Sequence, residues 1–191
     1  MRIIAGVARG RGLVAPPGRE VRPTLDRVRE ALFSILTPRV AGARFLDLYA
    51  GSGANGLEAM SRGASRVVLV DSDRRSLAAI RDNVARTGLS GDLRSVQATL
   101  PEGLEQVGGP FDIVFADPPY AYEHYEALLN ALSSASLLDA EGIVCIEHDR
   151  HTLLPETCGG LHRARERRWG ATAVGFYGWA NQQQREVGFS R

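Results

Sequence analysis

The sequence predicts an α/β protein built on a mostly parallel sheet with helices on both faces. Strand-like and helix-like segments alternate from residue 24 to residue 147, and this alternation is typical of parallel strands joined by crossover helices. The 191 residues are enough for one such domain and a short appendage. Hydrophobic residues make up 44% of the chain and charged residues 24%, a balance that indicates a folded rather than a disordered protein.

The first part of the chain is expected to be a basic appendage outside the sheet. Residues 2–14 predict two short strands around the run GVARGRG at 6–12, and a Pro-Pro-Gly loop follows at 16–18. Residues 1–30 hold seven arginines against three acidic residues, so this end of the chain is suited to binding an anion. We therefore divide the chain into an N-terminal basic hairpin extension at 1–22, a main domain at 23–180 and a flexible tail at 181–191.

The elements of the main domain follow from the hydrophobic periodicity. A helix is predicted at 24–36, with Thr24 as its N-cap and with Pro38 ending the pattern. Strands are predicted at 44–49, 67–70, 93–97, 111–116 and 143–147, and further helices at 54–62, 74–87 and 122–132. The last two runs, 161–169 and 172–179, meet at Gly170 and predict an antiparallel hairpin at one edge of the sheet.

Membrane, secreted and metal-binding classes are not supported. No apolar run reaches the roughly 18–20 residues that span a bilayer, and the first residues lack the hydrophobic region of a signal peptide. We therefore expect a cytoplasmic protein without membrane contact. Cys145 and Cys158 show no Cys-x-x-Cys spacing and no clustered histidines accompany them, so we expect neither a disulfide nor a metal site.

The segment FLDLYAGSGANG at 45–56 predicts a buried strand that ends in a glycine-rich turn and opens a helix. Glycines in such a turn let a ligand approach the bare backbone amides. Asp47, four residues before Gly51, falls at the strand end, where its carboxylate can meet an ammonium group or a ribose. A dinucleotide site, which brings a pyrophosphate to the helix N-terminus, gains nothing from this extra anion. Together with the segments that follow, this one favours a methyltransferase over a dehydrogenase.

A second acidic side chain follows the next strand. The strand at 67–70 ends at Asp71, and Asp73 stands two residues further along. An acid at this place commonly accepts both hydroxyl groups of a ribose, so Asp71 predicts a cofactor that contains a nucleoside. The alternative, that both residues cap the following helix, is stronger for Asp73 than for Asp71.

The run Asp117-Pro118-Pro119-Tyr120 follows the fourth predicted strand. Its two prolines make a stiff loop at the carboxyl edge of the sheet, where ligands bind in open α/β folds. If the Asp117 carboxylate and the Pro118 carbonyl each accept one N–H of a base amine, the nitrogen becomes tetrahedral and its lone pair is freed for attack on a methyl group. Tyr120 offers a ring on which that base can stack. The alternative is that this run is merely a turn.

Together these motifs resemble those of the bacterial RsmD family. The resemblance rests on RPTLDRVREALF at 22–33, on residues 46–63 and on Asp117-Pro118-Pro119-Tyr120, and it runs from residue 2 to about residue 180. It implies a class I S-adenosylmethionine-dependent methyltransferase fold, with a Rossmann-like seven-stranded sheet whose last strand is antiparallel. It also implies methyl transfer from S-adenosylmethionine to the exocyclic N2 of a guanine in 16S ribosomal RNA.

The motifs and the resemblance assign three groups of residues. Cofactor contacts are expected from Thr24, Asp47, Tyr49, Ala50, Gly51, Ser52, Gly53, Gly56, Asp71, Ser72, Ala98 and Thr99. The catalytic loop comprises Asp117, Pro118, Pro119 and Tyr120. Phosphate contacts to RNA, which position the nucleic acid without specifying its sequence, are expected from Arg2, Arg9, Arg11, Arg19 and Arg22.

Other interpretations remain open from the sequence. The expected partner is 16S ribosomal RNA in the small subunit or an assembly intermediate, bound by a monomer. An adenine-N6 methyltransferase of DNA or RNA is the main alternative, and a non-catalytic RNA-binding assembly factor is another. The charged residues at 26–30 also suit ion pairs within a helix, and the arginines between residues 163 and 168 suit an exposed edge strand as well as RNA.

Overall fold

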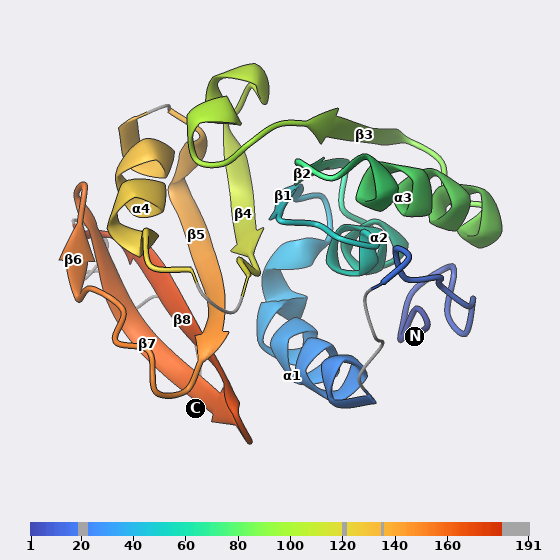
Figure 1. Cartoon of the computed structure of the whole chain (residues 1–191), viewed down its shortest axis with the longest axis horizontal. Helices are drawn as coiled ribbons and strands as arrows, with labels where there is room; N and C mark the ends of the chain where they lie inside the picture. Colours follow the sequence, from blue (N-terminus) through green and yellow to red (C-terminus); the bar gives the residue numbers. More distant parts are fainter. Residues whose placement is uncertain (19–22, 120–121, 135, 181–191) are drawn as a thin grey trace.

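The computed structural model describes residues 1–18, 23–119, 122–134 and 136–180, with only the backbone of 23–25. Within them, eight strands form one sheet in the order β3-β2-β1-β4-β5-β8-β7-β6 (Figure 1). The strands are β1 Arg44–Leu48, β2 Arg66–Asp71, β3 Asp92–Gln97, β4 Phe111–Ala116, β5 Leu138–Asp149, β6 Thr157–Cys158, β7 Leu161–Trp169 and β8 Thr172–Trp179. The first five are parallel, whereas β8 is antiparallel to both of its neighbours, β5 and β7.

The helices lie on both faces of this sheet, as the alternation of segments predicted. They are α1 Pro23–Val40, α2 Ala54–Ser61, α3 Arg74–Thr87 and α4 Tyr125–Ser134, together with a short 3-10 helix at Glu102–Gln106. Apolar side chains of α1, α2 and α3 share one core with Phe45 and Val67, whereas α4 and the 3-10 helix share the other core with Leu46 and Val68. Since neighbouring strand residues point to opposite faces, each central strand contributes to both cores.

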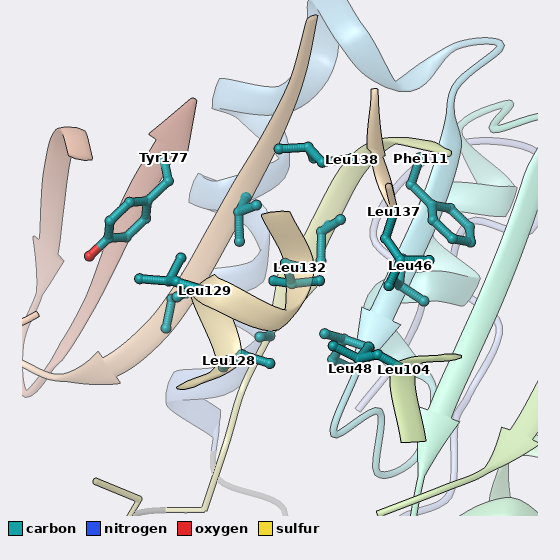
Figure 2. Close-up of a cluster of buried hydrophobic side chains, with 14 of the residues drawn as sticks. Leu46, Leu48, Leu104, Phe111, Leu128, Leu129, Leu132, Leu137, Leu138 and Tyr177 are labelled. Atoms are coloured by element: carbon teal, nitrogen blue, oxygen red, sulfur yellow. The ribbon is translucent and has the colours of Figure 1, made fainter. Parts of the chain in front are cut away.

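The core under α4 shows how the local pattern becomes packing. Leu128, Leu129 and Leu132 are all fully buried and share a core with Leu46 and Leu48 of β1. In Figure 2, Leu132 lies toward Leu46, whereas Leu129 lies toward Tyr177 of β8. The i, i+1 and i+4 spacing of the three leucines puts them on one face of the helix. Full burial of one leucine side chain contributes about 1.5–3 kcal/mol, so this face holds α4 against the sheet.

The sheet differs from the predicted one at its far edge. The two-residue strand β6 pairs with β7 and makes an eighth strand, which is too short for a periodicity to reveal. The strand predicted at 143–147 extends over Leu138–Asp149. The predicted antiparallel last strand is confirmed by β8.

Helix α1 begins earlier and ends later than predicted. It starts at Pro23, so Thr24 lies in its first turn and is not the N-cap. Proline suits a helix start because its fixed φ is helical and its missing N–H would have no partner there. The helix also continues through Pro38 to Val40. Val40 lies one turn after Leu36, and both are buried, so the same apolar stripe carries the helix past the proline.

The N-terminal segment contains one bridge in place of the two predicted strands. Arg2 pairs with Gly12, and the amide of Ile3 donates to the Arg11 carbonyl at 2.9 Å. Gly6 and Gly10, within the connecting turn, have φ values of 83° and 82°. Such left-handed positions interrupt the extended backbone that a strand requires.

The same segment is held against the main domain by hydrogen bonds over long sequence distances. The amides of Ile4 and Ala5 donate to the buried Glu58 carboxylate of α2 at 2.7 and 3.0 Å. The buried Asn83 amide of α3 accepts from the Val14 N–H at 2.8 Å and donates to the carbonyls of Val14 and Ser52, both at 2.9 Å. The segment thus lies outside the sheet and docks on α2 and α3.

No helix among the described residues has the length and the apolar character needed to cross a membrane. The proposed boundaries of the extension and the main domain stay predictions.

Candidate active site

Four acidic side chains gather where neighbouring strands end. Asp47 lies one residue before the end of β1, Asp71 ends β2, Asp117 follows β4 and Glu147 lies near the end of β5. Leu48 pairs with Val70 on one side and with Ala116 on the other, so these parallel strands end level with one another. Because neighbouring strands are about 4.8 Å apart, these side chains line one edge of the sheet.

The glycine-rich turn between β1 and α2 has the special backbone that its sequence predicted. Tyr49, Gly51 and Gly53 have φ values of 58°, 56° and 76°, and Gly53 is the N-cap of α2. A Cβ on Gly56 would lie 2.6 Å from a Leu69 methyl carbon and 3.3 Å from Asp47 Oδ2. Gly56 therefore lets α2 approach β2 and the Asp47 carboxylate closely.

Asp47 is anchored by the helix that follows it. Its Oδ2 accepts the Gly56 N–H at 2.8 Å, and 1% of the residue is exposed. Burial raises the pKa of Asp47 well above its ordinary value, against the effect of the Gly56 hydrogen bond, and the carboxylates of Asp117 and Asp71 raise it further. A cation placed here would therefore favour the ionised carboxylate, which suits the predicted contact with an ammonium group.

Asp71 connects two turns. Its Oδ2 accepts the Gly51 N–H at 2.8 Å and its Oδ1 accepts the Asp73 N–H at 2.9 Å. The capping role falls to Asp73, which is the N-cap of α3 and accepts the Arg75 N–H. Each Asp71 oxygen retains a second lone pair, so this carboxylate can also accept hydrogen bonds from hydroxyl groups.

A pocket of about 440 Å³ lies beside the ends of β2 and β3. Its lining includes Ser72, Ala98 and Thr99, three of the predicted cofactor residues. Glu102 and Gln106 of the 3-10 helix also line it and were missed, because a five-residue helix after a proline has no periodicity to read. The volume lies in the range of small-molecule sites, about 300–1,000 Å³.

The predicted catalytic loop lies next to the glycine-rich turn. The Asp117 N–H donates to the Leu48 carbonyl at 3.4 Å, and the Asp117 side chain is exposed. Pro118 is buried, and Pro119 is exposed and accepts the Tyr122 N–H at 2.9 Å. Tyr120 lies outside the described residues, so its predicted stacking role stays a prediction.

An aromatic cluster beside the loop was missed from the sequence. The Tyr122 ring lies edge-on to those of Tyr49 and Tyr125, with centroids 5.6 and 5.1 Å away. Burial raises the pKa of all three hydroxyl groups, so the cluster is neutral at physiological pH. Tyr49, predicted as a cofactor contact, thus packs against the segment that follows the loop.

Glu147 is the acidic residue that the sequence analysis missed. Ala116 pairs with Ile146, which places Glu147 beside Asp117 on the neighbouring strand. Burial, together with the Asp117 carboxylate, raises the pKa of Glu147 well above its ordinary value. The strand-end rule that drew attention to Asp71 would also have found Glu147, which follows four apolar residues.

The N-terminal arginines lie around a second pocket, of about 430 Å³, between the N-terminal segment and α1. Arg2, Arg9 and Arg27 line it together with Asp26 and Glu30. Arg11 is exposed, whereas Arg19 and Arg22 lie outside the described residues.

One of the ion pairs expected within the helix at residues 26–30 is present in α1. Arg29, which is 4% exposed, donates to Asp26 Oδ1 at 2.8 Å and to the Arg2 carbonyl at 2.6 Å. Arg29 thus balances the charge of Asp26. Among the described residues that line the second pocket, Arg2, Arg9 and Arg27 then outnumber the one remaining acidic residue, Glu30.

Comparison with known proteins finds similar sequences and structures that are named as methyltransferases. Residues 1–178 match the family described as "Conserved hypothetical protein 95". "Ribosomal RNA small subunit methyltransferase D" of Escherichia coli is 38% identical over 177 residues, covering 93% of this chain and 89% of the relative. "Putative rRNA methyltransferase YlbH" of Bacillus subtilis is 36% identical over 181 residues, covering 93% and 98%. The solved structure "Putative methyltransferase yhhF from Escherichia coli" superposes with a TM-score of 0.80 at 37% identity, covering 94% and 97%.

Proposed function

The chain belongs to the RsmD family, as its matches to the family and to methyltransferase D show, and on that premise we propose that it methylates the exocyclic N2 of a guanine in 16S ribosomal RNA. The observation that carries the proposal is the common edge of the sheet, where the loop with Asp117 lies level with Asp47 and Asp71. A cofactor held at β1 and β2 and a base held after β4 would meet there.

The residues at this edge fit S-adenosylmethionine. That cofactor carries a sulfonium and an ammonium group, a ribose diol and an adenine. The buried carboxylate of Asp47 suits a cationic group, and that of Asp71 retains lone pairs for hydroxyl groups. The 440 Å³ pocket with Ser72, Ala98 and Thr99 offers room for the adenine. When bound, S-adenosylmethionine supplies an electrophilic methyl group and takes the electron pair of the broken carbon–sulfur bond.

The chain contributes positioning to the methyl transfer. A base amine is a weak nucleophile because its lone pair is delocalised into the ring. The Asp117 carboxylate and the Pro118 carbonyl each accept one of its N–H groups, which favours a tetrahedral nitrogen with a localised lone pair. As the new carbon–nitrogen bond forms, the nitrogen gains positive charge and becomes acidic. The Asp117 carboxylate then accepts the released proton.

The basic pocket of the N-terminal segment supports RNA as the substrate. Arg2, Arg9 and Arg27 converge on it from two segments of the chain, and arginine suits phosphate groups because its planar fork can bind two oxygens at once. The small-subunit context, a monomeric enzyme and a cytoplasmic location belong to the same proposal.

The test is methyl transfer to ribosomal RNA from a strain that lacks the gene. Purified protein and tritium-labelled S-adenosylmethionine should label the 16S RNA, and mass spectrometry of the digested RNA should find N2-methylguanine. An N6-methyladenine product would favour the adenine-N6 alternative. Transfer by Asp117→Ala at the wild-type rate, or no transfer by the wild type to RNA or to assembled subunits, would contradict the proposal.

A further inference from the structure

Strand β7 carries arginines on both faces of the sheet. Arg165 pairs with Phe176 and Arg167 with Val174, and directly paired residues of antiparallel strands share a face. Phe176 and Val174 belong to the core beneath α1, so Arg165 and Arg167 lie on the α1 face. Arg168, the next residue along the strand, lies on the opposite face.

Arg167 lies in one row with the catalytic loop. Asp117 lies beside Glu147 on β5, Glu147 pairs with Val174 on β8, and Val174 pairs with Arg167 on β7. Phe115 and Cys145, two residues earlier on their strands, belong to the core beneath α1, so this row shares the α1 face.

The row crosses three strand spacings of about 4.8 Å, so Arg167 stands about 14 Å from Asp117. Both ends of the row, Asp117 and Arg167, are exposed.

The β7–β8 hairpin also projects past the end of β4, beside the loop that contains Asp117. Strand β5 continues from Ile146, which is level with the last residue of β4, to Asp149, which pairs with Thr172 of β8. Three further residues extend the sheet by about 10 Å past the end of β4. Figure 1 shows this end of the hairpin projecting beyond the arrowhead of β4. A strand of RNA that brings a base to Asp117 must pass close to this end of the hairpin.

The charges on the α1 face of β7 are suited to an anion. Arg167 forms no ion pair with any residue that the structure describes. Arg165 lies over the Phe176 ring, 4.7 Å from its centroid, and burial and the Arg167 charge lower its pKa. Two neighbouring cations on one face repel each other, and a phosphate bound beside them would relieve that repulsion.

We propose that Arg167 binds a backbone phosphate of the RNA strand whose target base is held at Asp117, and that Arg165, two residues earlier on the same face of β7, adds to the positive charge there. This inference rests on the proposed function and adds a second RNA contact, on the side of the loop away from the Arg2, Arg9 and Arg27 pocket. The RNA then lies across the carboxyl edge of the sheet, between the N-terminal segment and the β7–β8 hairpin.

Arg168 provides a matched control for a test of this contact. It is adjacent in sequence, is also an exposed arginine and lies on the opposite face, where it donates to Glu166 at 2.7 Å. Arg167→Ala and Arg168→Ala therefore remove the same charge from the same strand, but only the first should weaken RNA binding. Thermal melting of both variants checks that the fold is retained.

The experiment measures binding of 16S RNA fragments by fluorescence anisotropy, and methyl-transfer kinetics, at several salt concentrations. Arg167→Ala should weaken binding and raise KM about three- to tenfold, with a salt slope shallower by about 1, while kcat and cofactor affinity stay unchanged. Arg167→Lys should restore most of the salt slope.

Equal effects of Arg167→Ala and Arg168→Ala, or no effect of Arg167→Ala on RNA binding, would overturn the inference. Loss of activity on assembled subunits alone, with binding of naked RNA unchanged, would point to a ribosomal protein at Arg167 and would overturn it too. A wild type that binds RNA through Arg167 but transfers no methyl group would instead contradict the proposed function.

Discussion

The two halves of the carboxyl edge hold their acidic side chains in different ways. Asp47 and Asp71, on β1 and β2, are buried and accept backbone N–H groups of the chain itself. Asp117, after β4, is exposed on a loop stiffened by two prolines. On the proposed function, the buried pair would therefore maintain the shape of the glycine-rich turn as well as contact the cofactor, whereas the Asp117 side chain lies at the surface, where a substrate would approach. Substitutions in the first half should affect stability and affinity, and those in the second half should affect turnover.

Asp117→Ala should give the largest effect and would sharpen this contrast. Loss of an acceptor that acts in the transition state typically costs about 2.7–4 kcal/mol, or roughly 100- to 1,000-fold in rate. Single-turnover measurements with saturating cofactor should show this loss, while calorimetry shows unchanged cofactor affinity. Asp117→Asn, which keeps one acceptor oxygen, should lose less. A reduction smaller than about fivefold in Asp117→Ala would mean that the loop does not carry the chemistry.

Asp47→Ala should instead reduce stability and cofactor affinity together. It leaves the buried Gly56 N–H without its 2.8 Å acceptor, and an unsatisfied buried donor costs about 1–3 kcal/mol. Chemical denaturation and calorimetry would measure the two losses. If Asp47→Ala lowered turnover but neither stability nor affinity, the contrast between the two halves would fail.

Asp47→Asn tests the electrostatic part of the same contrast. The pKa of Asp47 is raised in the folded protein, so its stabilising contribution is present below the pKa of the unfolded chain and is lost as pH rises through the folded value. Asn carries no such titration. Without cofactor, the unfolding free energy of the wild type relative to Asp47→Asn should therefore fall between acidic and neutral pH. A difference independent of pH would show that Asp47 is not strained by its burial.

Glu147→Gln should have a small effect, although Glu147 lies beside Asp117. The raised pKa of Glu147 keeps it protonated in a range where an ordinary glutamate is ionised, and glutamine resembles that neutral form. Turnover below this pKa should change by less than about threefold, a factor that corresponds to under 1 kcal/mol. Turnover in Glu147→Gln as low as in Asp117→Ala would show that both carboxyl groups act on the substrate.

Arg9→Ala should give a comparably small change, confined to RNA. Arg9 is exposed and lines the second pocket, so its loss should make the salt dependence of RNA binding shallower by about 1 without changing melting temperature. Deleting residues 1–14 would not test the same point, because the deletion also removes the partners of Glu58 and Asn83. An unchanged salt slope in Arg9→Ala would exclude it as a phosphate contact.

Features set by local sequence were predicted well. The predicted strands and helices of the main domain occur in the predicted order, and Asp47, Asp71 and Asp117 each lie at or next to the strand end that their sequence indicated. The glycine turn was also correct, since Gly53 and Gly56 are required by a positive φ and by a close approach of α2.

Features set by packing across the sheet were not predicted. The apolar run before Glu147 marks it as a strand end, but its position beside Asp117 depends on the register of β4 and β5, and Asn83 acts through a hydrogen bond to a segment 69 residues away. No local pattern of residues encodes such pairings. Thr24 was misplaced as an N-cap because Pro23 starts the helix. Tyr120, Arg19 and Arg22 lie outside the described residues, so their proposed roles stay predictions.

The docking of the N-terminal segment constrains the order in which this protein is assembled. Its hydrogen-bond partners at Glu58 and Asn83 are separated from it by 54 and 69 residues. Contacts of such separation form late because the intervening chain must first be closed into a loop. On the ribosome, the earliest part of this segment to emerge must therefore wait for α2 and α3 before it can dock. The Asn83 side chain also donates to the Ser52 carbonyl, so the docked segment and the glycine-rich turn share one anchor on α3.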